Sequence, residues 1–372
     1  MKIIVAPDSF KGALRAPEAA AAFAAGWREV RPDDEVLELP LSDGGEGMAG
    51  ALKRALNGED VPLTVHDALR RPVTARAVIA GDMAVVETAE AAGIERLERG
   101  ELNPLAATSF GAGEMLRALY DRGFRKFIVG IGGSATVDGG AGMLQALGMR
   151  LTDADGRALP PGIGGGALRH AAAADISMLA PWRECGIKVA CDVTNPLCGS
   201  SGAAAVFGPQ KGATPEMVPV LDDNLRRWAG LFGDDGTHPG DGAAGGMGFA
   251  LRRVLGAEMV SGARLVMQYS GFDAALKGAS LVVTGEGCSD GQTACGKLCA
   301  QVAESAHAAG VPVMLFSGAL RGDTRELETL FDGCYSIAAG PGTLEAAMAD
   351  TAKNLRRAGA NVARIAGRLA SR

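Results

Sequence analysis

Short apolar runs and longer amphipathic stretches alternate at both ends of this chain. The run at residues 2–6 predicts a strand, and Pro17 followed by Glu18 predicts the first turn of a helix that continues to about residue 28. Residues 35–39 predict a second strand. From about residue 271 the alternation returns, with strands predicted at 281–284, 311–316 and 334–338 and helices at 296–309 and 344–369. This alternation is typical of an α/β fold with a parallel sheet.

The middle of the chain has a different pattern. Residues 74–79 and 84–88 are strand-like and flank a short turn, which predicts a β-hairpin and some antiparallel pairing. Further strands are predicted at 127–131 and 187–191, and helices at 111–120 and 142–147. Because the two ends share one pattern, we predict an α/β domain built from residues 1–60 and 270–372. Residues 61–269 are then an inserted second α/β domain that contains some antiparallel strands.

The segment 127–148 is the densest in candidate chemistry. Its apolar run ends in a cluster of glycines that carries two hydroxyls and one carboxylate, and a helical pattern follows. A strand, a glycine-rich turn and a helix together present backbone N–H groups to an anion. Gly132, Gly133 and Ser134 are therefore candidate hydrogen-bond donors to a phosphate, and Asp138 is a candidate general base.

Polar side chains also follow the first two predicted strands. Asp8, Ser9 and Lys11 come after the first, and Asp43 and Glu46 come after the second. Open α/β sheets bind ligands at the carboxyl ends of their strands. We expect Lys11 to neutralise phosphate charge, Asp8, Ser9 and Asp43 to contact substrate, and Asp43 with Glu46 to be an alternative metal site. The alternative is structural: the first loop caps a helix, and Glu46 lies in a first helical turn.

A third acidic loop follows the strand predicted at 187–191. Asp192 leaves this apolar run into a turn that contains Asn195, and Lys211 lies nearby in the sequence. A carboxylate in this position can act as a base, so Asp192 is the first candidate, with Asn195 contacting substrate and Lys211 contacting phosphate. The alternative is that the aspartate and the asparagine only form Asx turns.

A fourth acidic loop is predicted after the strand at 281–284. Glu286 and Asp290 lie four residues apart in it, a spacing that can place two carboxylates on one Mg²⁺ ion. Two solvated loop acids are the alternative.

Two further motifs are incomplete. Residues 291–298 match a Walker A loop except that Leu298 stands where Ser or Thr must bind Mg²⁺. Residues 130–135 match G-x-G-x-x-A, but the acidic residues downstream, Asp153 and Asp155, fall in a turn and not at the end of a second parallel strand. The four histidines are scattered without ligand spacing, which argues against a histidine metal site or triad.

Composition narrows the class of partner. The 372 residues include 54 glycines and carry a net charge of −6 with acids and bases interspersed, which argues against nucleic acid or an anionic membrane as the partner. No apolar run approaches the ~20 residues of a membrane span, and the start does not resemble a signal peptide. The seven cysteines form no C-x-x-C pair and suit reduced thiols. We therefore expect a cytoplasmic protein with small-molecule partners; nothing in the sequence predicts its oligomeric state.

Eight motifs follow one another along the chain in an order that one enzyme family shares. They are A-P-D-S-F-K-G at Ala6, D-G-G-E-G at Asp43, G-I-G-G-S-A-T at Gly130, D-G-G-A-G-M-L-Q-A-L-G at Asp138, A-C-D-V-T-N-P-L at Ala190, F-G-P-Q-K-G-A at Phe207, G-A-A-G-G-M-G at Gly242 and T-G-E-G at Thr284. With them the chain resembles, from end to end, the class I glycerate kinases, bacterial ATP-dependent kinases that phosphorylate D-glycerate, usually on the 2-hydroxyl.

The resemblance implies a flavodoxin-like domain with an inserted α/β domain, and an active site in the cleft between them. It implies ATP as the phosphoryl donor. Phosphoryl transfer needs charge neutralisation, so we expect Mg²⁺ to be held by Glu286 and Asp290. The expected product is 2-phosphoglycerate.

The chain departs from the family pattern at several positions, mostly toward apolar side chains. Cys288 and Ser289 replace the family's Arg and Ile, Val137 replaces Asn, and Met48 replaces Thr. Phe110 replaces an Arg, and Ala107 and Ala112 replace two threonines. The family's G-P-L-G is replaced by Ala68, Leu69, Arg70 and Arg71. If these positions line the pocket, a different small hydroxy acid or phosphorylation of the 3-hydroxyl becomes an alternative. A non-catalytic binder of nucleotide or metabolite, and a Rossmann oxidoreductase, are more distant alternatives.

Overall fold

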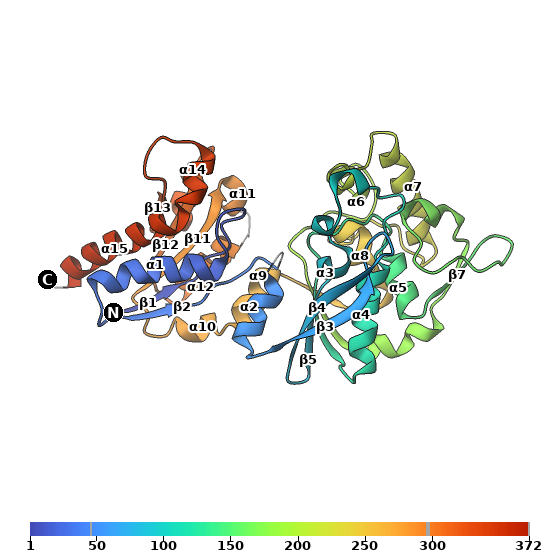
Figure 1. Ribbon diagram of the computed structural model, residues 1–372, viewed down its shortest axis with the longest axis horizontal. Coiled ribbons are helices and arrows are strands. Elements are labelled where there is room, and N and C mark those ends of the chain that lie inside the picture. The colour runs from blue at the N-terminus through green and yellow to red at the C-terminus, as the bar shows by residue number, and fades with distance from the viewer. Residues whose placement is uncertain (45–46, 295–297, 371–372) are drawn as a thin grey trace. The chain divides into compact units, whose positions relative to one another are not determined.

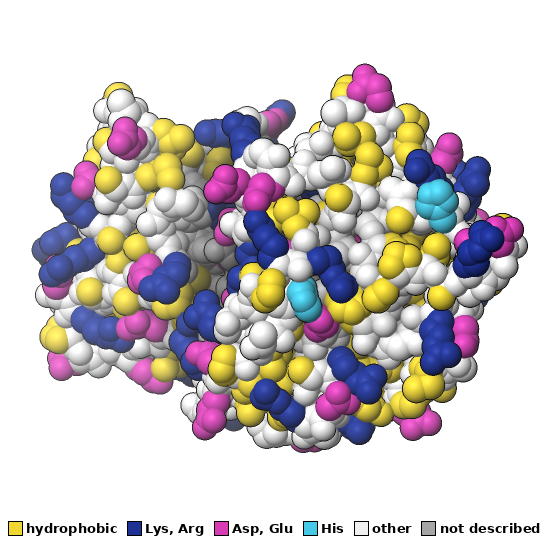
Figure 2. Space-filling model, turned by 45° about the vertical axis from the view of Figure 1, so that its right-hand side comes forward, with side chains coloured by type: hydrophobic (Ala, Val, Ile, Leu, Met, Phe, Trp, Pro, Cys, Tyr) yellow, Lys and Arg dark blue, Asp and Glu magenta, His cyan; other side chains and the backbone are white. Residues whose placement is uncertain are grey.

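Both ends of the chain contribute to one unit, and the middle of the chain forms another. The computed structural model describes residues 1–44, 47–294 and 298–370. Unit 1 comprises Met1–Asp43 and Ala263–Arg372, and unit 2 comprises Gly44–Gly262 (Figure 1). Acidic and basic side chains are interspersed over the face shown in Figure 2.

Unit 1 is built on a five-stranded sheet in the order β13-β12-β11-β1-β2. All four neighbouring pairs are parallel. The strands are β1 (Lys2–Val5), β2 (Glu35–Glu38), β11 (Leu281–Ser289), β12 (Val313–Leu320) and β13 (Gly333–Ser336). Counted from β2 this is the 2-1-3-4-5 order of flavodoxin-like folds, so the predicted fold class is confirmed.

Two long helices of unit 1 pack against each other, α1 (Ala16–Val30) and α15 (Thr351–Ala370) (Figure 1). Glycine allows the approach, because a Cβ atom at Gly26 would lie 1.8 Å from the carbonyl oxygen of Arg356. Phe23 and Trp27 of α1 are buried in the unit's core with strand residues. The other helices are α9 (Gly262–Tyr269), α10 (Phe272–Ala275), α11 (Gly291–Ala294), α12 (Leu298–Ala308), α13 (Arg325–Leu330) and α14 (Leu344–Ala349).

Unit 2 contains a six-stranded mixed sheet in the order β10-β9-β6-β5-β4-β3. Its strands are β3 (Glu59–His66), β4 (Pro72–Ala80), β5 (Met83–Glu87), β6 (Lys126–Gly130), β9 (Gly186–Ala190) and β10 (Glu258–Val260). The β3–β4 and β4–β5 pairs are antiparallel and the other three are parallel. The predicted hairpin is confirmed, with Ala80 opposite Met83.

Helices and short elements surround this sheet. The helices are α2 (Met48–Ala55), α3 (Ala89–Ala92), α4 (Phe110–Asp121), α5 (Ala141–Leu147), α6 (Ala203–Phe207), α7 (Met217–Gly230) and α8 (Met247–Phe249), which continues into a π-helical turn at Ala250–Val254. A small hairpin pairs β7 (Arg150–Thr152) with β8 (Ala173–Asp175). No described helix is long and apolar enough to cross a membrane.

Two features differ from the sequence-based expectation. Unit 2 begins at Gly44 and not at residue 61, because α2 packs on β4 and β5, and unit 1 resumes at Ala263 and not at residue 270. Strand β11 continues through Ser289, where a loop was expected, because its backbone remains paired with β12 as far as Leu320.

Candidate active site

The carboxyl ends of the unit 1 strands border a cavity of about 1030 Å³. Its polar side consists of five residues that the sequence singled out: Asp8, Ser9, Lys11, Asp43 and Glu286. They follow β1 and β2 or lie near the end of β11. In the 2-1-3-4-5 order the chain switches direction between β1 and β11, which is where open α/β sheets bind ligands.

Three carboxylates and one lysine share this polar side. Asp8 is only 8% exposed. Its burial, together with the charges of Asp43 and Glu286, raises its pKa to about 7, although the Ser9 N–H donates to it at 2.6 Å and Lys11 lowers the pKa. Lys11 Nζ lies 3.8 Å from an Asp43 carboxylate oxygen. Crowded carboxylates of this kind favour either a bound proton or a bound cation.

Glu286 lies on a strand, and the expectation that it shares a flexible loop with Asp290 is wrong. Its Oε1 accepts hydrogen bonds from Ser289 Oγ at 2.8 Å and Thr293 Oγ1 at 2.7 Å. The backbone N–H of Asp290 donates to the same Thr293 hydroxyl oxygen, at 3.2 Å. Asp290 is absent from the described residues that border the cavity.

These positions bear on the prediction that Glu286 and Asp290 together hold Mg²⁺, because only Glu286 borders the cavity. Across residues 1–44, 47–294 and 298–370, no group of three or more His, Cys, Asp or Glu is arranged to hold a metal ion. Glu286 shares the cavity with Asp8 and Asp43 and not with its predicted partner. Glu46 and the centre of the Walker-like segment, residues 295–297, lie outside the described residues.

Asp138 in unit 2 is wholly buried. It accepts hydrogen bonds from Ser109 N–H at 2.7 Å, Ser109 Oγ at 2.8 Å, Gly140 N–H at 3.1 Å and Gly142 N–H at 3.2 Å. Burial raises its pKa, and these donors act in the opposite direction. The carboxylate therefore joins the first turns of α4 and α5, and this geometry does not support the predicted role of base.

Lys211 is also enclosed, with 2% of its surface exposed. Its Nζ donates to Ser134 Oγ at 2.9 Å and to the Thr136 carbonyl oxygen at 2.8 Å. Burial lowers its pKa to about 7, while the nearby charge of Asp138 acts in the opposite direction. Gly132 and Gly133 are exposed on the same loop. The lysine thus anchors the glycine loop from inside, and the loop's backbone at the two glycines faces solvent.

Asp192 and Asn195 lie in the loop after β9, as expected. Asp192 is exposed, and both of its carboxylate oxygens lie 3.2 Å from the Gly262 nitrogen at the start of α9. The carbonyl oxygen of Asn195 accepts from the N–H groups of Gly240 at 3.2 Å and Gly242 at 2.9 Å. The loop is thus held by the Asp192 carboxylate at Gly262 and by the backbone contacts of Asn195, and Asp192 remains an exposed residue.

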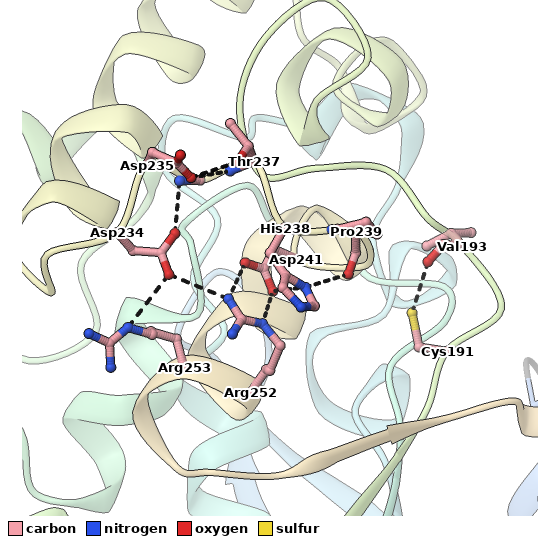
Figure 3. A network of polar contacts seen from close by, with 11 residues as sticks. Cys191, Val193, Asp234, Asp235, Thr237, His238, Pro239, Asp241, Arg252 and Arg253 are labelled. Atoms are coloured by element: carbon pink, nitrogen blue, oxygen red, sulfur yellow. Dashed lines mark hydrogen bonds and ion pairs between the residues drawn. The ribbon is translucent and has the colours of Figure 1, made fainter.

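An ion pair between a buried aspartate and a partly exposed arginine supports the segment that holds Asn195, and the sequence analysis missed it. Asp241 is wholly buried and accepts from Arg252 Nε at 2.6 Å and Nη2 at 2.7 Å (Figure 3). Arg252 lies on the π-helical turn and also contacts Asp234 at 3.5 Å. The pair thereby fixes residues 240–242, whose amides hold Asn195.

The departures from the family pattern fall in different environments. Cys288 is exposed and borders the unit 1 cavity. Val137 is completely buried in the core of unit 2, so the idea that it lines a pocket is wrong. The Arg70 guanidinium lies 4.0 Å from the centre of the Phe110 ring, so an arginine covers the phenylalanine that replaces the family's own arginine.

Comparison with known proteins identifies the family to which the chain belongs. The model of the glycerate kinase family matches residues 3–367. The chain is 42% identical to glycerate 2-kinase of Escherichia coli K12 and 42% identical to glycerate kinase of Bacillus subtilis 168, in each case over 98% of this chain and 97% of the relative. The crystal structure of a Salmonella typhimurium LT2 protein provisionally named glycerate kinase 2 superposes with a TM-score of 0.88 at 42% identity over the whole of both chains. The chain therefore belongs to the glycerate kinase family, whose members are phosphotransferases with an alcohol group as acceptor.

Proposed function

We propose that this protein transfers the γ-phosphoryl group of ATP to the 2-hydroxyl of D-glycerate and so forms 2-phosphoglycerate. The observation that carries the proposal is the grouping of Asp8, Lys11, Asp43 and Glu286 around one cavity at the switch point of the unit 1 sheet. Phosphoryl transfer depends on positioning and on neutralising phosphate charge, and such a set of side chains can serve both needs. The 2-hydroxyl is suggested by the E. coli relative that is named glycerate 2-kinase.

We propose Asp43 and Glu286 as the two protein residues that hold Mg²⁺, with Asp8 as their acidic neighbour. Their carboxylate oxygens suit this hard cation, and the pKa of Asp8, raised by burial and by its acidic neighbours, marks a place where a cation is favourable. Mg²⁺ commonly takes only one or two protein carboxylates and completes its shell with water and substrate phosphates. When bound, it would neutralise the phosphate oxygens.

The other roles follow from exposure. The Lys11 side chain is 75% exposed, so it is free to reach a phosphate. Asp192 is the proposed acceptor of the substrate's hydroxyl proton, and Ser9 and Asn195 are proposed substrate contacts. Gly132 and Gly133 would donate backbone N–H groups to the transferred phosphoryl group, while Ser134 and Lys211 hold their loop in place.

A coupled assay of ADP release with D-glycerate tests the activity, and ¹H NMR of the product identifies the phosphorylated hydroxyl. We expect turnover that EDTA abolishes and Mg²⁺ restores. Glu286→Gln should lower kcat/KM at least ~10-fold and raise the Mg²⁺ concentration needed, with Asp290→Asn as the matched control. Asp192→Asn should lower kcat by about 10²–10⁴. Binding of ATP without turnover of any small hydroxy acid would refute the kinase activity, and a 3-phosphoglycerate product would refute the regiochemistry.

A second candidate is a kinase of another small hydroxy acid. It is favoured by Cys288, which stands at the cavity where the family has an arginine and so removes a bidentate partner for a carboxylate. Cys288→Arg should then lower the KM for glycerate relative to less anionic acceptors. Unchanged glycerate kinetics would show that position 288 does not set specificity.

A further inference from the structure

The carboxylates and the lysine described above occupy one part of the unit 1 cavity lining. Another part is formed by the segment after β13, by α14 and by the first turn of α15, where apolar side chains are interspersed with Thr343, Asp350 and Thr351. Its members include Ile337, Ala338, Pro341, Leu344, Ala347 and Met348. A cavity of about 1030 Å³ is at the upper end of the size of small-molecule sites and far exceeds the needs of a three-carbon acid.

Asn354 on α15 is a further polar residue in this part of the lining. It borders the cavity and is only 4% exposed. Its backbone N–H donates to the carbonyl oxygen of Asp350, just before the helix, at 2.9 Å, but its side-chain amide makes no hydrogen bond to any residue that the structure describes. A nearly buried amide without a partner is unfavourable unless a ligand or water satisfies it. It therefore marks a place where a polar ligand edge belongs.

We propose that this part of the cavity binds the nucleoside of the phosphoryl donor and that the Asn354 amide recognises the edge of the adenine base. The inference rests on the proposed function. A carboxamide presents a donor and an acceptor side by side, and adenine offers the complementary acceptor and donor at its N7 and N6 edge. The flat apolar faces of the base would contact side chains such as Ile337 and Met348.

The arrangement of charge agrees with this placement. A nucleoside triphosphate has an apolar end and a highly charged end. The cavity offers apolar side chains at α14 and α15, with Asp350 between these helices as the one carboxylate there among the described lining residues, and a charged part at the ends of β1 and β11, where Lys11 and Glu286 lie. A bound nucleotide with its base at Asn354 would therefore direct its phosphates toward the groups proposed to hold Mg²⁺.

Asn354→Asp tests the base contact. A carboxylate only accepts hydrogen bonds, so it loses the donor that adenine N7 requires but can accept from the N1 and N2 donors of guanine. The ratio of kcat/KM for ATP to that for GTP should fall about 5- to 100-fold, since one bidentate base contact discriminates by that much. Asn361→Asp makes the same change at an exposed position of the same helix and should leave the ratio unchanged.

A second pair of variants does not depend on a buried carboxylate. Ala347→Leu adds bulk on an exposed turn of α14 that borders the cavity, and Ala349→Leu does so on the same helix away from the cavity. The first should raise the KM for ATP severalfold and leave the KM for glycerate unchanged, and the second should change neither. Thermal unfolding of each variant checks that the fold is kept.

The outcomes separate the inference from the proposed function. An unchanged ATP to GTP ratio in Asn354→Asp, or a rise in the KM for glycerate alone in Ala347→Leu, overturns the nucleoside site while kinase activity stands. If the wild type phosphorylates no hydroxy acid, the kinase activity fails, and calorimetry with ATP and GTP still tests the site. In that case equal effects of Asn354→Asp and Asn361→Asp on ATP binding overturn it.

Discussion

The buried lysine of unit 2 makes the stability of that unit depend on pH. The pKa of Lys211 is lowered by burial to about 7, from 10.5 in an unfolded chain. Between these two values the unfolded chain binds more protons than the folded one, so the free energy of unfolding rises as the pH rises. At pH values below about 7 the cost of burying the charged lysine is fully present.

The size of the effect follows from the two pKa values. The lysine lowers the stability by about 4.4 kcal/mol at pH 7.0 and by about 1.4 kcal/mol at pH 9.5, relative to a side chain that does not titrate. Lys211→Met supplies such a side chain with a similar unbranched shape. Because the lost hydrogen bonds to Ser134 and Thr136 affect the variant similarly at both pH values, they cancel from the comparison. The free energy of unfolding of the wild type, relative to that of the variant, should therefore increase by about 3 kcal/mol between pH 7.0 and 9.5.

Urea unfolding at the two pH values measures this difference. Trp182 and Trp228 are buried in unit 2 and report on it, and Trp27→Phe removes the tryptophan of unit 1 from the fluorescence signal. Lys126→Met changes an exposed lysine of the same unit and is the control. A stability difference between the wild type and Lys211→Met that stays constant from pH 7.0 to 9.5 would show that Lys211 keeps an ordinary pKa, and the reasoning would be refuted.

Three further predictions concern packing and buried polar groups. Asp241→Asn removes the carboxylate that pairs with Arg252 and leaves this partly buried guanidinium with Asp234 at 3.5 Å, so unit 2 should lose about 1.5–3 kcal/mol in urea unfolding, and a loss below ~1 kcal/mol would contradict the pairing. Asp138→Ala removes four hydrogen bonds and should lower the Tm of unit 2 even with ATP and glycerate bound; a variant that only loses activity would restore Asp138 as a base candidate. Gly359→Ala places a Cβ atom 2.2 Å from the Phe23 carbonyl oxygen, so amide hydrogen exchange in α15 should accelerate, whereas Gly50→Ala, at an open position, should have no such effect.

Much of the architecture follows from the chain's patterns because they are local. The apolar runs at residues 2–6 and 35–39 and the hairpin around Gly81 depend on neighbouring residues only, and the structure contains all of them. The end of β11 was mistaken for a loop because it is rich in glycine. Its extended form depends on pairing with β12, a partner that local composition does not show.

The site was less predictable because long-range partners decide what a polar residue does. Asp138 before a glycine-rich turn looks the same in sequence whether it binds a ligand or caps a helix, and its partner Ser109 belongs to another helix. Lys211 was expected to contact phosphate, but its ammonium group donates a hydrogen bond to Ser134, which is distant in the sequence. Asn354 is one of many polar residues of α15, and only its burial beside a cavity distinguishes it.

The division of unit 1 between the two chain ends has a consequence for synthesis on the ribosome. Unit 2 is complete in sequence before any residue of β11 exists, whereas Ile3 of β1 must await Leu281 as its sheet partner. Strands β1 and β2 therefore spend most of translation with an open edge, a state that favours mispairing. We expect nascent chains released before residue 281 to contain a protease-resistant unit 2 and a protease-sensitive amino terminus, so that chaperone dependence would concentrate in the first forty residues.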